Sequence, residues 1–408
     1  MTTYSAVVTT GIYCRPGCGG RPLAVNTRTF GLAAAAEAAG FRACHRCRPY
    51  RIGGPVGSDA PDIVCEAVQL IINGALDDGG TEAALAKQVG MSPRHLRRLF
   101  LRYLGASPDQ LARSRRAHFA RRLLDDTDLS VLDIAFASGF GSLRQFNRTM
   151  PEVFGASPTD LRARRRRADR LAADGGLALR IPVVPGYDWD AVRSFLGARA
   201  IPGVETVDGD TYRRAITVAD APGLVEVRGA AEEGYLLLRV HLPYWEGLIH
   251  LVERVGTVLG VDSDHAVGAA VLHRDPVLGA LAASHHGLAI PGAWNLFEAG
   301  VWAILSGGQP GRDHLLAAFV THLGTPVPGL PAGLAHTFPD PATVTAQSLA
   351  PAGLPAAEAA AVAALAATLT PGGQVQLEPD QWQPWLALGA AHLTALGMMA
   401  GDSTPQRR

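Results

Sequence analysis

The stretch that decides the fold is Ser130-Val-Leu-Asp-Ile-Ala-Phe-Ala-Ser-Gly-Phe-Gly-Ser-Leu-Arg-Gln-Phe-Asn-Arg148. Its apolar residues recur with helical spacing on both sides of a glycine-containing turn, which predicts a helix, a turn and a second helix. The unit occurs twice, because Leu104-Gly-Ala-Ser-Pro-Asp-Gln-Leu recurs fifty residues later as Phe154-Gly-Ala-Ser-Pro-Thr-Asp-Leu. We therefore predict two helix-turn-helix units in tandem.

Each copy of the repeat follows one predicted unit. The first unit has helices over Thr81–Val89 and Pro93–Tyr103, and the second has helices over Ser130–Ala137 and Ser142–Val153. Residues 62–167 resemble the AraC-type DNA-binding domain throughout, and such modules place each second helix in successive major grooves. The spacing assigns to the core Leu96, Leu99, Phe100, Phe146 and Phe154.

The candidate base readers are the polar residues at the starts of the two second helices. Arg and Gln offer the bidentate hydrogen bonding that base edges require. The alternative, a helical bundle that binds no DNA, must account for both the repeat and the basic charge of this half. A metal-ligand role for His95 is a much weaker alternative. The candidates are Arg94, His95, Arg98, Ser142, Arg144, Gln145 and Arg148.

Charge divides the 408-residue chain into two halves, although its net charge is zero. Residues 1–170 carry 25 Lys and Arg against 15 Asp and Glu, whereas residues 171–408 carry 12 against 22. This asymmetry predicts a nucleic-acid-binding front joined to a different C-terminal part. The length predicts two to four domains, and a composition of 48% hydrophobic and 18% charged residues is globular. No stretch resembles a transmembrane helix or a signal peptide, so we expect a soluble cytoplasmic protein.

Four of the five cysteines form two tight pairs near the N-terminus, Cys14-x3-Cys18 and Cys44-x2-Cys47. In a cytoplasmic protein, paired cysteines at this spacing favour a metal over disulfides. Zn²⁺ takes four tetrahedral ligands, and each pair can supply two of them. The alternative is four ordinary free thiols. The fifth cysteine, Cys65, shares an apolar helical face with Val68 and Ile72, so we expect it to be a small core residue.

The segments around these cysteines resemble the N-terminal domain of the Ada family. They are Thr9-Thr10-Gly11-Ile12-Tyr13-Cys14-Arg15-Pro16 and Gly40-Phe41-Arg42-Ala43-Cys44-His45-Arg46-Cys47-Arg48-Pro49. The resemblance covers about residues 4–49. It implies repair of DNA methylphosphotriesters by direct transfer of the methyl group to a zinc-bound cysteine, which by the family pattern is Cys14.

Physical chemistry is consistent with this implied role. Zinc keeps the thiolate ionised at neutral pH, and the thiolate is the nucleophile. Methylation changes the formal charge of a zinc–tetrathiolate site from −2 to −1, which should strengthen binding to phosphates. Candidate contacts to the DNA backbone are Thr10, Arg21, Arg42 and Arg46, and the alternative for each Arg is a solvated surface charge. Two features depart from the family: a shorter segment before the first cysteine, and glycines at 17, 19 and 20.

The C-terminal half resembles AlkA-type 3-methyladenine glycosylases. Strands are predicted in Leu177–Val184, Arg213–Val218 and Tyr235–Val240, and helical patterns return after about Gly247, interrupted by a Pro-rich loop at 326–341. The resemblance is carried by Tyr187-Asp-Trp-Asp, Ala200-Ile-Pro-Gly-Val-Glu, Tyr212-Arg-Arg, Gly223-Leu-Val-Glu-Val and Ile290-Pro-Gly-Ala-Trp-Asn-Leu-Phe-Glu-Ala-Gly-Val-Trp-Ala-Ile-Leu.

The family's helix-hairpin-helix and its catalytic aspartate have no counterpart here. The nearest stretch is Pro371-Gly-Gly-Gln-Val-Gln, and it is followed soon by Gln381-Trp-Gln-Pro-Trp-Leu, which resembles the family's tail. Asp380 and Asp402 lack the expected context, and the family's Gln-Gln is altered to Ser306-Gly-Gly-Gln309. Four tryptophans could line a cleft, but we favour core packing for each of them: Trp294, Trp302, Trp382 and Trp385. We expect His285, His286 and His314 to be surface or capping residues.

These observations predict a multidomain α+β protein. Its expected parts are a small zinc-bound α/β domain (1–50), an all-α double helix-turn-helix (62–167), an AlkA-like antiparallel sheet domain (177–246) and a truncated glycosylase-like helical domain (247–402). Residues 51–61 form a Gly/Pro linker. The expected partners are double-stranded DNA, as promoter and as methylated backbone, with RNA polymerase as a further candidate and no membrane.

The favoured function is an alkylation-responsive transcriptional regulator that accepts a methyl group from DNA stoichiometrically and carries an inactive glycosylase-like domain. One alternative is a bifunctional regulator that retains 3-methyladenine excision. The other is a pure transcription factor with structural zinc and a C-terminal domain that binds a ligand.

Overall fold

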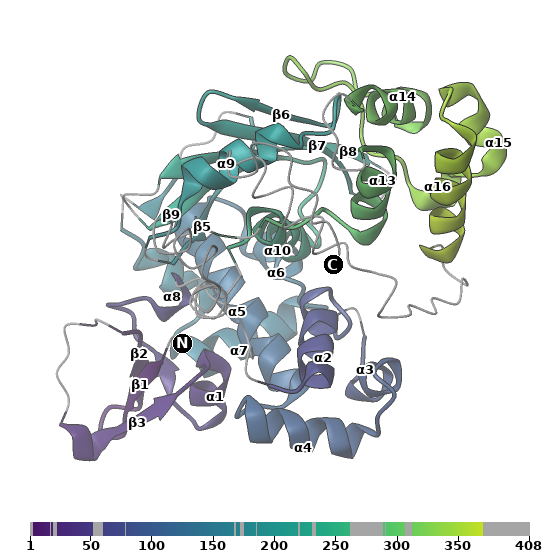
Figure 1. Cartoon of the computed structure of the whole chain (residues 1–408). Helices are drawn as coiled ribbons and strands as arrows, with labels where there is room; N and C mark the ends of the chain where they lie inside the picture. The colour runs from purple at the N-terminus through teal and green to yellow at the C-terminus, as the bar shows by residue number, and fades with distance from the viewer. Residues whose placement is uncertain are drawn as a thin grey trace, which may run out of the picture. The chain divides into compact units, whose positions relative to one another are not determined.

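The computed structural model describes residues 3–16, 18, 23–51, 60–77, 79–166, 169–171, 175–184, 186–218, 221–230, 234–261, 289, 291–306 and 312–369. The chain divides into two compact units (Figure 1). The first comprises Met1–Tyr187, Ala230–Leu237 and Tyr244–Gly287, and the second comprises Asp188–Gly229, Leu238–Pro243 and Leu288–Arg408. Residues 52–59 of the predicted linker lie outside the described residues.

A four-stranded sheet in the order β3-β1-β2-β4 forms the start of the first unit. Its strands are β1 (Tyr4–Val7), β2 (Ile12–Cys14), β3 (Thr27–Phe30) and β4 (Arg42–Ala43). Helix α1 (Ala33–Ala38) lies between β3 and β4 in the chain and contacts β1, β3 and β4. Strands β1 and β2 are antiparallel, whereas β2 and β4 are parallel. Gly11 has a φ of 63°, a conformation that favours glycine, and it lets the chain turn tightly into β2.

The helices of the double helix-turn-helix follow the predicted pattern. They are α2 (Asp62–Ile72), α3 (Glu82–Gln88), α4 (Pro93–Tyr103), α5 (Pro108–Asp126), α6 (Val131–Ala137), α7 (Leu143–Phe154) and α8 (Pro158–Ala163). Each Ser-Pro pair starts a helix, because the serine side chain accepts a backbone N–H of the first turn and proline occupies the first helical position.

Most of the predicted core residues of this module are buried. Leu96, Phe100, Phe146 and Phe154 are at most 1% exposed, and Leu99 is partly buried against the same core. The prediction for Cys65 is wrong, since its side chain is only half-buried and its thiol donates to the carbonyl of Ala60 (3.4 Å). The buried face of α2 is instead formed by Val64, Ala67, Val68 and Ile71, and Cys65 lies at its edge.

A five-stranded sheet has the order β5-β9-β8-β7-β6. The three predicted strands are confirmed as β5 (Leu177–Pro182), β7 (Thr211–Val218) and β9 (Tyr235–His241), and the sheet adds β6 (Glu205–Asp208) and β8 (Ala221–Ala230). Strand β7 pairs antiparallel with both β6 and β8. Helix α10 (Leu248–Leu259) belongs to the first unit.

The second unit contains the remaining described α-helices of the C-terminal half. They are α9 (Trp189–Ala198), α13 (Leu296–Ser306), α14 (Asp313–Leu323), α15 (Ala346–Leu349) and α16 (Ala356–Leu369). Phe297, Val301, Phe319 and Leu365 are buried in a shared apolar core. Among the described residues, none of the helices has the length and apolar character needed to cross a membrane.

Candidate metal centre

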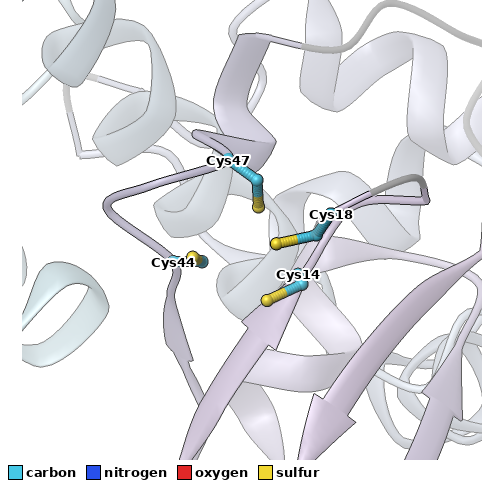
Figure 2. Close-up of side chains that lie close together, drawn as sticks. All are labelled: Cys14, Cys18, Cys44 and Cys47. Atoms are coloured by element: carbon cyan, nitrogen blue, oxygen red, sulfur yellow. The ribbon is translucent and has the colours of Figure 1, made fainter. Parts of the chain in front are cut away.

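The two cysteine pairs meet because strands β2 and β4 run parallel and end side by side. The amide of Cys44 donates to the carbonyl of Tyr13 (3.0 Å), which places Cys44 beside Cys14. The sulfurs of Cys14, Cys18, Cys44 and Cys47 all lie within 4.8 Å of one another, and Figure 2 shows the side chains converging. A tetrahedral site with Zn–S bonds of about 2.3 Å separates its sulfurs by about 3.8 Å, so small adjustments suffice to hold zinc.

The electrostatics of the cluster also favour a divalent cation. Burial, followed by the neighbouring Cys44 and Cys47 sulfurs, raises the pKa of Cys14 well above the ordinary value. Burial likewise raises the pKa of Cys47 to about 12, with a contribution from Cys44. Burial opposes ionisation of Cys44 too, but backbone amides of Cys47 and Arg46 lower its pKa. Four adjacent thiolates therefore require a compensating cation, and a metal ion supplies that charge.

A buried polar network lies directly behind Cys14. The preceding residue, Tyr13, is fully buried and donates its hydroxyl to Glu37 Oε1 (2.6 Å). His118, on helix α5, places Nε2 2.7 Å from the same Glu37 oxygen and 3.1 Å from the Tyr13 hydroxyl. The strand that ends in Cys14 is thereby tied to the long helix of the DNA-binding module.

A second network lies behind Cys47. Arg48 pairs with Asp169 (2.7 Å) and approaches Asp125 on α5 (3.7 Å). Asp125 is completely buried, and it accepts hydrogen bonds from the Tyr50 hydroxyl (2.8 Å) and from Arg121 (2.6 Å). Sequence reasoning missed both networks. The adjacency of Tyr13 and Arg48 to cysteines was visible, but their partners on α5 have no local signal.

The residues near the cysteines that are predicted to contact the DNA backbone differ in their exposure to solvent. Thr10 and Arg46 are exposed, while Arg42 is half-buried. The side chain of Arg42 lies against the end of α7, since a Cβ built on Gly155 would be 3.0 Å from Arg42 Cδ. Arg21 lies outside the described residues. Arg46 lies between the ligand candidates Cys44 and Cys47, whereas Thr10 precedes β2 and Arg42 begins β4, opposite Ile12 at the start of β2.

The predicted base readers lie at the starts of α4 and α7. Arg94, His95 and Arg98 are exposed, and Arg98 Nη2 lies 3.1 Å from His95 Nδ1. Arg144 and Arg148 are exposed as well, and Gln145 is half-buried. Ser142 caps α7, because its hydroxyl oxygen accepts the Gln145 amide (3.2 Å).

The glycosylase-like second unit contains a buried charge network. Arg214 is 1% exposed and hydrogen-bonds to Glu205 (2.6 Å) and Glu298 (3.0 Å), and its guanidinium stacks on Trp294 at 4.6 Å. Core packing is thereby confirmed for Trp294. A small depression beside the network is lined by Arg199, Ile201, Glu205, Ala293, Glu298, Ala299 and Trp302.

Trp302 packs against the apolar core and also lines this depression. Its side chain therefore combines the two predicted roles, core packing and lining a cleft. His314 is exposed, as expected. The predictions for Trp382, Trp385, Asp380, Asp402 and the segment after Pro371 fall outside the described residues, as do those for residues 285–286 and 307–309.

Three family descriptions match the chain: "Metal binding domain of Ada" over residues 2–50, "Helix-turn-helix domain" over 85–164 and "AlkA N-terminal domain" over 178–295. A probable bifunctional transcriptional activator/DNA repair enzyme AlkA from Mycobacterium tuberculosis is 37% identical over 344 residues, which cover 82% of this chain and 68% of the relative. The bifunctional transcriptional activator/DNA repair enzyme Ada of Escherichia coli is 35% identical over 158 residues, 38% of this chain and 43% of that protein.

Among solved structures, a 3-methyladenine DNA-glycosylase from Archaeoglobus fulgidus is similar with a TM-score of 0.39 and 19% identity, over 46% of this chain and 66% of that one. The four clustered cysteines together with the matched metal-binding domain indicate zinc, and the matched helix-turn-helix indicates DNA. The chain belongs to the Ada/AlkA fusion family of bifunctional transcriptional activators and DNA repair proteins.

Proposed function

We propose that this protein senses DNA alkylation by accepting a methyl group on Cys14 and then activates transcription as a DNA-bound regulator. The observation that carries the proposal is the convergence of four half-buried cysteine sulfurs at the ends of β2 and β4, with exposed Arg46 between Cys44 and Cys47. Zn²⁺, when bound, keeps the acceptor sulfur ionised at neutral pH.

The transfer is a substitution at the methyl carbon of a methylphosphotriester. The Cys14 sulfur forms a bond to this carbon as the carbon–oxygen bond to the phosphate breaks. The leaving oxygen keeps the electron pair, so the phosphate regains its negative charge and no proton moves. Cys14 becomes a thioether and cannot react again, which makes the repair stoichiometric. The site loses one negative charge, so its repulsion of neighbouring phosphates decreases.

The residues around the cysteines have supporting roles in this proposal. Arg42 and Arg46, with Arg21, attract the phosphates that flank the lesion, and Thr10 offers a hydroxyl to the same backbone. The network of Tyr13, Glu37 and His118 holds the strand that ends in Cys14 and so fixes the direction from which its sulfur attacks.

Peptide mass mapping after exposure to DNA that contains methylphosphotriesters tests the acceptor. One added CH₂ should appear on the peptide that carries Cys14, and Cys14→Ser should abolish it. Cys65→Ser is the matched control, because this half-buried thiol lies on α2 outside the cluster. A methyl group on another cysteine would contradict the assignment. No methyl group at all would favour the pure transcription factor with structural zinc.

Sequence recognition is assigned to the predicted base readers at the N-terminal ends of α4 and α7. Arg94, His95 and Arg98 would contact one major groove, and Ser142, Arg144, Gln145 and Arg148 the next. Bound in this way at a promoter, the protein would recruit RNA polymerase. A pull-down on promoter DNA, with and without prior methylation of the protein, measures whether polymerase occupancy rises after methyl transfer.

We propose further that base excision is absent. Excision needs a carboxylate held near the glycosidic bond of a flipped nucleotide. Glu205 and Glu298 are the carboxylates that line the depression of the second unit, and both are engaged by Arg214. DNA containing 3-methyladenine should therefore release no free base above a no-protein control. Release that disappears in Asp380→Asn would instead favour the bifunctional alternative.

A further inference from the structure

Helix α10, the first helix after the sheet of the glycosylase-like region, contacts through His250 the end of α2 and the connection that precedes the first helix-turn-helix unit. The His250 ring places Nδ1 3.0 Å from the carbonyl oxygen of Ile72, the last residue of α2. Its Nε2 lies 2.7 Å from Asp77 Oδ2, in the connection between α2 and α3. One imidazole thus joins α10 to the last residue of α2 and to the middle of the connection that leads to α3.

The same carboxylate is held from the other side by helix α5. Arg116 donates from Nε to Asp77 Oδ1 (2.7 Å) and from Nη2 to the Leu76 carbonyl (2.5 Å). The neighbouring Arg115 forms an ion pair with Glu253, one turn further along α10. Helix α10 is therefore attached to the helix that links the two helix-turn-helix units directly, through Glu253 and Arg115, and indirectly, through His250, Asp77 and Arg116.

The second helix-turn-helix unit meets this interface at its turn. Gly139, between α6 and α7, has a φ of 77°, and a Cβ there would lie 2.9 Å from Asp77 Oδ2 and 3.6 Å from Ile249 Cγ2. A side chain at this position would collide with the Asp77 carboxylate. Glycine thus allows the turn of the second unit to close against Asp77 and α10.

The hydrogen bonds of His250 determine its charge. Both of its partners, the Ile72 carbonyl and the Asp77 carboxylate, are acceptors, so both ring nitrogens must carry a proton. Burial alone would lower the pKa of His250, but Asp77, the Ile72 carbonyl and Glu253 together raise it. Arg115 and Arg116 face the same region from α5 and are paired with Glu253 and Asp77.

We propose that α10 is a brace for DNA reading: through His250, Asp77 and Gly139 it fixes the spacing of the two helix-turn-helix units. Recognition helices that enter successive major grooves must lie about 34 Å apart. The 19-residue helix α5 links the two helix-turn-helix units. The loops at its two ends leave the angle between each unit and α5 free to change. A fixed third element removes that freedom before binding, so less entropy is lost when both helices dock. The glycosylase-like region thereby serves the regulator without any base excision.

The proposed brace is tested by comparing DNA-binding affinity for a duplex with two half-sites and for a duplex with only one. The wild-type protein first selects a duplex from a random pool, and the same duplex with one half scrambled provides the half-site. His250→Gln should weaken binding to the intact duplex about tenfold, which corresponds to about 1.4 kcal/mol, and leave the half-site unchanged. Glu253→Gln should cause a smaller selective loss. His241→Gln is the matched control, because His241 pairs with Glu226 on the sheet of the second unit.

A pH series adds a readout that a merely structural role would not change. The wild-type preference for the intact duplex should fall as pH rises through the pKa of His250, while His250→Gln should show no such slope. Zinc content and circular dichroism confirm that each variant is folded. Equal losses on both duplexes would mean that His250 acts on DNA contact or on folding, and no loss on either would mean that α10 does not brace. Each of these results would overturn the proposal.

Discussion

Arg214→Met removes a buried cation from between the carboxylates of Glu205 and Glu298, which are then buried without a counter-ion. The side chains of Arg214, Glu205 and Glu298 are only 2%, 4% and 5% exposed, so water cannot replace the lost partner. Removing one member of a buried ion pair costs about 3–5 kcal/mol. A typical unfolding free energy is roughly 5–15 kcal/mol, so this loss is a large fraction of it.

Glu298→Gln changes the same buried network, but we expect its effect on folding stability to depend on pH. Burial raises the pKa of Glu298, and the neighbouring Glu205 adds to this, whereas Arg214 opposes it. The folded state therefore favours the proton on Glu298, and this contribution to stability is lost as pH rises from about 4.3, the unfolded value, through the raised folded pKa. The neutral amide avoids that loss, so the stability of Glu298→Gln relative to wild type should increase with pH.

Hydrogen exchange followed by mass spectrometry measures both variants locally, on peptides from β7 and α13. A loss of about 3–5 kcal/mol corresponds to a fall in protection of roughly 100-fold to 1000-fold or more, at 1.4 kcal/mol per factor of ten. Arg193→Met is the control, because the Arg193–Asp190 pair on α9 is open to solvent on the Asp190 side (Arg193 26% and Asp190 84% exposed) and should contribute only about 0–1 kcal/mol. Equal protection in Arg214→Met and Arg193→Met would refute the reasoning.

Three further predictions concern the metal site and DNA. Cys44→Ser combined with Cys47→Ser should abolish zinc binding, and zinc retained at one ion per chain by elemental analysis would contradict the assigned ligands. Tyr13→Phe removes one buried hydroxyl but leaves the Glu37–His118 bond, so urea unfolding of the zinc domain should show a loss of about 1–2 kcal/mol. Arg144→Ala should weaken binding to the selected duplex by about 1–3 kcal/mol in anisotropy titrations at fixed salt, and relax selection at one base pair. An unchanged base preference would remove it from the readers.

Local chemistry in the sequence was sufficient for the helical module and the metal site. Serine caps and proline at the first helical position mark helix starts within three or four residues of chain, so α4 was predicted with its observed bounds. The paired spacing of the cysteines likewise limits which ligand set can close around one ion. Helical periodicity was less decisive for Cys65, because a residue at the edge of an apolar face can be core or half-exposed.

Only the tertiary structure decided which side chains pack behind the cysteine cluster and which connect α10 to the helix-turn-helix module. Tyr13 and His118 are 105 residues apart, and Asp77 and His250 are 173 apart. None of these four residues has a neighbour in sequence that indicates its partner. Capping and metal-ligand spacing act over one turn of chain, whereas a buried polar pair is satisfied by whichever element packs against it. Its partner is therefore fixed only when the helices and strands come together.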